Sequence, residues 1–212
     1  MTETDDVDVD ALERDIAQIK EAMGLHERYP TQFRLWLVYG LLVLLASFGS
    51  QAVVTFDLPG WGHAASWFGF MGLGALYSWY VGEDYNHPET GDDYPDTGVQ
   101  FLGIAGYLVV VLAVVTPTLE TLTPLEESAT LFALVIGAVG ATYVVQASTL
   151  KAYRIRARDR YTFYAGGLGM LAYAAVMVHV PLLLEWGYAI FGVGYAAYGI
   201  AAYMYLATED GE

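Results

Sequence analysis

Two histidines and a glutamate are the residues whose types and positions could hold a cofactor. His63 begins one apolar stretch, His179 lies near the end of another, and Glu185 follows soon after it. Imidazole nitrogens can ligate haem or a metal ion, and a carboxylate can add an oxygen. We therefore consider a haem or metal held by His63 and His179, with Glu185 as a further metal ligand. The alternative is that each is a polar residue solvated at a membrane surface. The sequence does not require any cofactor.

Two charged segments could also bind ligands. A basic cluster between the fourth and fifth apolar stretches consists of Lys151, Arg154, Arg156, Arg158 and Arg160. Such a cluster can bind anionic lipid headgroups. An acidic segment over residues 82–98 has enough carboxylates for a divalent cation, but its spacing does not match a calcium-binding loop. A solvated acidic loop is therefore the alternative for that segment.

The segment before the first apolar stretch carries a short heptad pattern. Its apolar residues are Val9, Leu12, Ile16, Ile19 and Met23, at alternating spacings of three and four. Gly24 and Pro30 end the pattern. We expect a short amphipathic helix that lies along the membrane or packs on cytoplasmic loops, because about two heptads are marginal as an isolated coiled coil. The alternative is that its apolar face binds a second subunit or a partner protein.

Most of the chain consists of apolar stretches long enough to cross a bilayer, which takes about 20 helical residues. Six stretches qualify, over residues 35–54, 61–81, 97–119, 130–150, 161–184 and 186–207. The sequence thus predicts an all-α polytopic membrane protein with six transmembrane helices. It divides into an acidic tail with the heptad helix (1–32), a transmembrane domain (33–207) and a second acidic tail (208–212).

The distribution of basic residues predicts the orientation in the cell membrane. Every Lys and Arg lies either before the first stretch or between the fourth and fifth. The loops near Asp57, Glu120 and Glu185 contain neither residue. Because cytoplasmic loops are enriched in Lys and Arg, we expect both termini to be cytoplasmic.

Small and aromatic residues suggest how the helices are arranged. Glycines and alanines in the even-numbered stretches, including Gly69 and Gly72, predict that these stretches form the packed interior. Trp61-Gly62 and Trp186-Gly187 open the second and sixth stretches, a weak similarity consistent with three tandem hairpins. We expect most aromatic residues near the stretch ends, Trp36 included, to form interfacial belts.

Composition excludes several classes of function. The chain has 24 acidic and 9 basic residues, a net charge of -15 and no cysteine. Its acid-rich, lysine-poor polar segments resemble those of halophilic archaeal proteins. The excess of acid argues against nucleic-acid binding, because phosphate contacts need clustered basic residues. The absence of cysteine excludes disulfides and thiolate metal sites.

The sequence leaves three functions open and contains no recognisable catalytic motif. The first is a non-enzymatic membrane subunit or scaffold that acts through its cytoplasmic helix, with a second copy or a membrane protein as partner. The second is a small transporter or channel for a neutral solute, since no acidic or basic residue lies in the middle of a stretch to serve a proton-coupled pump. The third is a haem- or metal-holding membrane protein.

Overall fold

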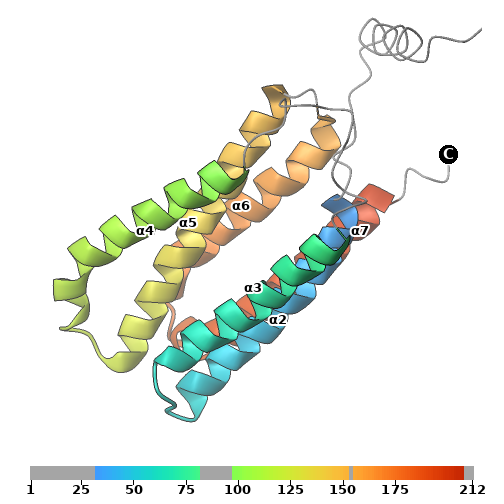
Figure 1. Cartoon of the computed structure of the whole chain (residues 1–212). Helices are drawn as coiled ribbons and strands as arrows, with labels where there is room; N and C mark the ends of the chain where they lie inside the picture. The colour runs from blue at the N-terminus through green and yellow to red at the C-terminus, as the bar shows by residue number, and fades with distance from the viewer. Residues whose placement is uncertain (1–31, 82–96, 153–154, 208–212) are drawn as a thin grey trace, which may run out of the picture.

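The computed structural model describes residues 32–81, 97–152 and 155–207, and this part of the chain is built from helices (Figure 1). These are α2 (Gln32–Thr55), α3 (Trp61–Val81), α4 (Thr97–Leu119), α5 (Pro124–Ala152), α6 (Ala157–Met177) and α7 (Pro181–Ala207). Consecutive helices run antiparallel in one bundle (Figure 1). The expected all-helical fold is confirmed for the described residues.

The largest errors in the predicted boundaries lie at two places, the α6–α7 connection and the start of α5. The fifth stretch was expected to reach residue 184, but α6 ends at Met177 and α7 already begins at Pro181. Proline lacks an N–H and suits the first turn of a helix, so it starts α7 early and places Glu185 inside a helix rather than in a loop.

The second wrong boundary is the start of α5, which lies at Pro124 instead of Thr130. The Glu126 carboxylate accepts hydrogen bonds from the backbone N–H of Thr123 at 2.9 Å and from its hydroxyl at 2.7 Å. The Glu126 N–H donates in return to the Thr123 hydroxyl at 3.4 Å. This reciprocal cap stabilises a first turn that hydropathy alone assigns to a loop.

Four of the described helices are long and apolar enough to cross a membrane. Their spans are Trp36–Thr55, Leu102–Leu119, Pro124–Lys151 and Pro181–Leu206. α3 and α6 do not meet the same measure, and α6 carries Arg158, Asp159 and Arg160 in its first turn. The protein is therefore membrane-embedded, with four clear candidate spans.

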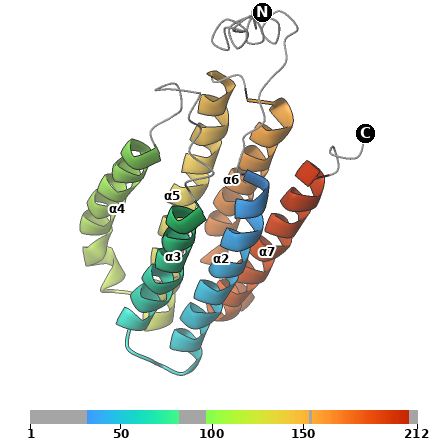
Figure 2. The same ribbon diagram turned by 45° about the vertical axis from the view of Figure 1, so that its right-hand side comes forward.

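The helices form two tightly packed pairs, each with one outer helix. α2 lies along α7, and α5 lies along α6 (Figure 2). α3 packs on α2, and α4 packs on α5. α6 and α7 follow each other in the chain, but they contact each other little. α6 packs mainly on α5, and α7 packs mainly on α2. We call the end with Trp61, Pro124 and Pro181 the histidine end, and the end where α6 begins and α7 ends the arginine end.

Each tight pair is built on direct backbone approach. A Cβ atom added to Gly167 in α6 would lie 2.7 Å from the Gly140 carbonyl oxygen of α5. A Cβ added to Gly199 in α7 would lie 2.7 Å from the Trp36 carbonyl oxygen of α2. Glycine at such crossings permits close van der Waals contact between helices.

The expectation that all even-numbered stretches form the interior is wrong for the second. A Cβ added to Gly69 or Gly72 in α3 would meet nothing within 4 Å, so these glycines lie on an open face. Small residues allow a neighbouring helix to approach closely. Whether a neighbour lies on that side depends on how the other helices are arranged.

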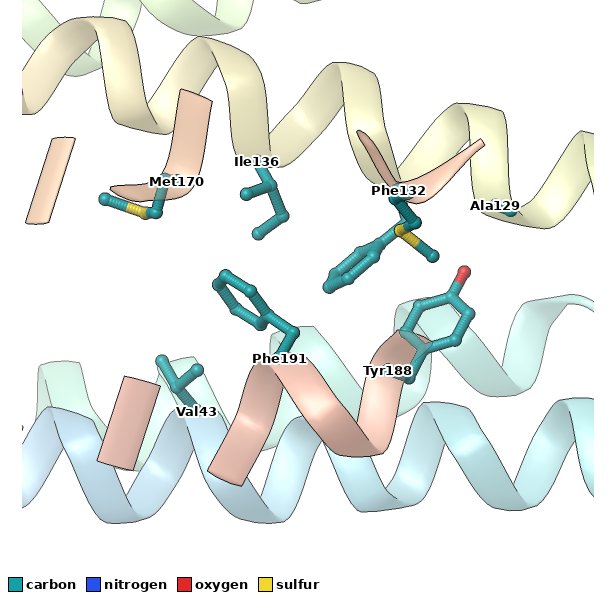
Figure 3. Packing of buried hydrophobic residues seen from close by; sticks show 8 residues of the cluster. Val43, Ala129, Phe132, Ile136, Met170, Tyr188 and Phe191 are labelled. Carbon is teal, nitrogen blue, oxygen red and sulfur yellow. The ribbon is translucent and has the colours of Figure 1, made fainter. Parts of the chain in front are cut away.

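Aromatic rings fill the space between the two pairs. Figure 3 shows Phe132 and Ile136 of α5 opposite Phe191 and Tyr188 of α7. The centroids of Phe132 and Tyr188 are 4.3 Å apart, and those of Phe132 and Phe191 are 5.3 Å apart. This seam of interlocking rings holds the two pairs together.

Trp36 belongs to this interior rather than to an interfacial belt, which corrects the sequence prediction. It is only 5% exposed, and its ring packs edge-on against Tyr198 at 5.4 Å and Tyr143 at 5.9 Å. By contrast, Trp61 and Trp79 are largely exposed, as a belt requires.

Replacing Gly167 with alanine tests the α5–α6 crossing. The new methyl group would press on the Gly140 carbonyl, so we expect a loss of about 1–3 kcal/mol in the free energy of unfolding. Gly169→Ala is the matched control on the same helix, because its Cβ would meet nothing within 4 Å. The stability of both variants is measured by unfolding in detergent micelles. Equal stability of the two variants would contradict this packing.

Candidate functional site

Polar side chains from three helices meet at the histidine end. The Ser128 hydroxyl of α5 lies 2.8 Å from the Tyr188 hydroxyl of α7 and 3.4 Å from Nε2 of His63 in α3. The Tyr188 hydroxyl donates to the Ser128 carbonyl at 3.1 Å. A hydroxyl can both donate and accept, so Ser128 can bond to Tyr188 and His63 at the same time.

This cluster sits directly on the aromatic seam. The His63 ring stacks on Tyr188, with centroids 5.1 Å apart and an interplanar angle of 28°. Tyr188 in turn packs against Phe132. The seam thus fixes the ring of Tyr188, and Tyr188 fixes both Ser128 and His63.

The arrangement differs from that of an activated serine nucleophile. An activated serine lies within hydrogen-bond reach of a base that a third group orients. Ser128 makes its shorter bond to Tyr188, and Nδ1 of His63 is buried with no hydrogen-bond partner among the described residues. The cluster is best understood as a bridge that joins α3, α5 and α7.

Gln51 provides a second polar bridge at the same end. Its Nε2 donates to the Glu185 carbonyl at 2.7 Å, and its Oε1 accepts from the Ala189 N–H at 3.2 Å. The side-chain amide therefore binds two backbone groups one turn apart in α7. Gln51 is 5% exposed, so this pairing satisfies a polar group that burial would otherwise destabilise.

The remaining residues of the predicted histidine site are exposed. His179 lies in the turn after α6, where its N–H donates to the Val176 carbonyl, and Glu185 is exposed on α7. Within the described ranges, no group of three His, Asp or Glu side chains could hold a metal ion. The haem or metal hypothesis stays a prediction, which the absorption spectrum and metal content of the purified protein would test.

The predicted basic cluster is partly described and lies at the arginine end. Lys151 is exposed, and Arg156 pairs with the buried Asp159 at 3.2 Å. Arg158 donates to the Tyr205 carbonyl, and its guanidinium carbon lies 4.0 Å from the centre of that ring. Arg154, the heptad residues 9–23 and almost all of the acidic segment 82–98 lie outside the described residues.

Sequence reasoning did not connect Ser128 with His63 or Tyr188. These partners are 65 and 60 residues away along the chain, so no local motif links them. The one available signal was that all three fall near the same predicted end of their stretches. Comparison of the chain with protein-family models, curated proteins and solved structures finds no match.

Two buried glutamines provide a test of opposite sign. Gln51→Leu removes both bonds to α7, so we expect a loss of about 1–3 kcal/mol of stability. Gln146 is also buried, but its Oε1 has no hydrogen-bond partner among the described residues. Gln146→Leu should therefore be neutral or stabilising in the same unfolding assay. Equal destabilisation by the two variants would contradict the bridge assigned to Gln51.

Proposed function

We propose that the chain is a non-enzymatic membrane scaffold of six spanning helices that assembles with a second copy of itself through α4. The observation that carries the proposal is how little of α4 the rest of the chain covers. Only 6% of its span is buried, against 39% for α2 and 28% for each of α5 and α7. A partner helix would cover surface that this chain leaves open.

α4 has two distinct faces. Partly buried residues recur with helical spacing on the side that packs on α5, at Ile104, Leu108, Val111 and Val115. The other side exposes Gly103, Gly106, Tyr107, Val110 and Val114. A Cβ added to either glycine would meet nothing within 4 Å. This second side, which we call the open face of α4, combines small residues with apolar ones.

A second copy of the chain is the proposed occupant of the open face, because a two-fold axis brings the same small and apolar residues of both copies together. In a two-fold dimer, the glycines of one α4 would approach those of the other, as small residues do at membrane helix interfaces. Copies with the same membrane orientation would also have their heptad segments, residues 9–23, on the same side of the membrane. The heptad pattern is a second feature that favours self-association.

The proposal includes the topology expected from the basic residues. α3 is 21 residues long, about 31 Å of helix, which is sufficient to cross the hydrocarbon core. In α6, the 17 residues after the charged first turn, 161–177, meet the lower limit for a span. The arginine end then faces the cytoplasm together with both termini. The aromatic seam fills the space between the helix pairs, which favours a scaffold over a path for solutes.

Bulky substitutions on the open face test the assembly. Gly106→Leu should leave the fold intact, because the side chain enters open space, but should weaken self-association by about tenfold or more through lost close packing. Single-molecule photobleaching in vesicles, over a range of protein-to-lipid ratios, would measure the dimer fraction. Ile16→Asp in the heptad segment should weaken the same dimer.

Gly169→Leu and Gly194→Leu are the matched controls for Gly106→Leu. Both glycines lie on open helix surface of α6 and α7, where an added Cβ meets nothing within 4 Å. These variants should dimerise as the unaltered protein does. A protein that stays monomeric at every density, or a Gly106→Leu variant that dimerises normally, would overturn the proposed assembly.

The topology is tested with single cysteines, which the cysteine-free chain makes unambiguous. Gly60→Cys, in the exposed loop after α2, should react with a membrane-impermeant maleimide on intact cells. Lys151→Cys, exposed at the arginine end, should react only after the membrane is permeabilised. The reverse pattern would show that the orientation is inverted.

A further inference from the structure

We infer that the arginine end holds a binding site for one anionic phospholipid between α6 and α7. The acyl chain lies in a groove between these helices, and the phosphate is bound beside Arg158. This site is separate from the open face of α4 and does not depend on assembly of the scaffold.

Side-chain hydrogen bonds join α6 and α7 at two levels. At the histidine end, the Tyr173 hydroxyl donates to the Gly187 carbonyl at 2.5 Å, and the Met177 side chain packs on Gly187. Near the arginine end, the Tyr198 hydroxyl donates to the Thr162 carbonyl. Elsewhere each helix packs mainly on a different partner, α6 on α5 and α7 on α2. The two helices therefore leave space between them.

That space is a cavity of about 280 Å³ with an apolar lining. Alanines and tyrosines form it, namely Ala165, Ala201 and Ala202 with Tyr161, Tyr198 and Tyr205, together with Thr162. Ala165 and Ala201 are exposed, so the groove opens onto the outer surface of the bundle. From Tyr198 to Tyr205 it follows α7 for about 10 Å, two turns of helix. Such a slot suits one segment of an alkyl chain.

Arg158 places positive charge at the mouth of this groove. It precedes Tyr161, Thr162 and Ala165 by three, four and seven residues and so shares their face of α6. Its guanidinium group donates to the Tyr205 carbonyl and lies over the Tyr205 ring, and Tyr205 is one of the residues that line the groove. A guanidinium can donate to several acceptors at once and matches the geometry of a phosphate.

Charge complementarity decides the occupant. Basic residues are concentrated between positions 151 and 160 in a chain whose net charge is -15. The one acid in that segment, Asp159, is buried and paired with Arg156. An apolar slot ending in a fixed guanidinium, at the level where a helix leaves the bilayer, fits a lipid whose headgroup is an anionic phosphate.

The experiment uses the full chain in nanodiscs with equal amounts of phosphatidylglycerol and phosphatidylcholine. Native mass spectrometry then counts the lipids retained. We expect one retained phosphatidylglycerol, with a preference of tenfold or more over phosphatidylcholine. Ala201→Phe should fill the groove and abolish retention of both lipids. Ala197→Phe is the matched control, because Ala197 is exposed on α7 outside the lining.

Arg158→Gln should remove the preference for the anionic lipid but leave chain binding, and Arg158→Lys should restore part of the preference. Lys151→Gln changes an exposed basic residue of the same segment and should have little effect. Thermal unfolding of each variant verifies that the fold is retained. Equal retention of both lipids, or retention that Ala201→Phe does not alter, would overturn the inference. Competition by free glycerol phosphate as effective as by lipid would show that the groove takes no part.

Discussion

The approach of helix backbones to contact distance is the constraint on which the structure depends. Lipid tails are as apolar as leucine side chains, so burying apolar surface does little to bring membrane helices together. Membrane helices are held together mainly by close packing of complementary surfaces. Gly140 and Gly167 permit such packing between α5 and α6. Gly40 and Gly199 do the same for α2 and α7. The arrangement of the other helices builds on these two pairs.

The aromatic seam is the consequence of setting two tight pairs side by side. Backbones that touch within a pair leave a wider space between the pairs, and large rings fill it. Contacts between neighbouring rings run from Trp36 through Tyr198, Tyr195 and Phe191 to Phe132 and Tyr188, ending at His63. The outer helices α3 and α4 lie at the edge of this arrangement, which α3 reaches through His63 and Trp67. That position explains why both expose so much apolar surface.

Hydropathy predicted where the helices are but not how they face. It located α3 and α4 to the residue, because charge-free runs end abruptly at those positions. It missed the capped start of α5, whose stability comes from hydrogen bonds rather than apolarity. Trp36 and Gly69 were misplaced for a common reason: hydropathy does not specify direction around the helix axis. The cluster of Ser128, His63 and Tyr188 could not be predicted, since only the packing of three helices creates it.

The polar residues of the spans differ in what they do for the fold. Thr142 and Thr149 donate to carbonyls one turn earlier in their own helix, so they place no constraint on neighbouring helices. Ser47 acts through its size, because even a single Cβ atom on Gly192 would lie 2.6 Å from its own. Gln51 and the histidine-end cluster bond between helices at one end of the bundle. Tyr198 and Arg158 join α6 to α7 toward the other end. Side-chain bonds therefore join helices toward both ends of the bundle, and the apolar groove between α6 and α7 lies beside the bonds at the arginine end.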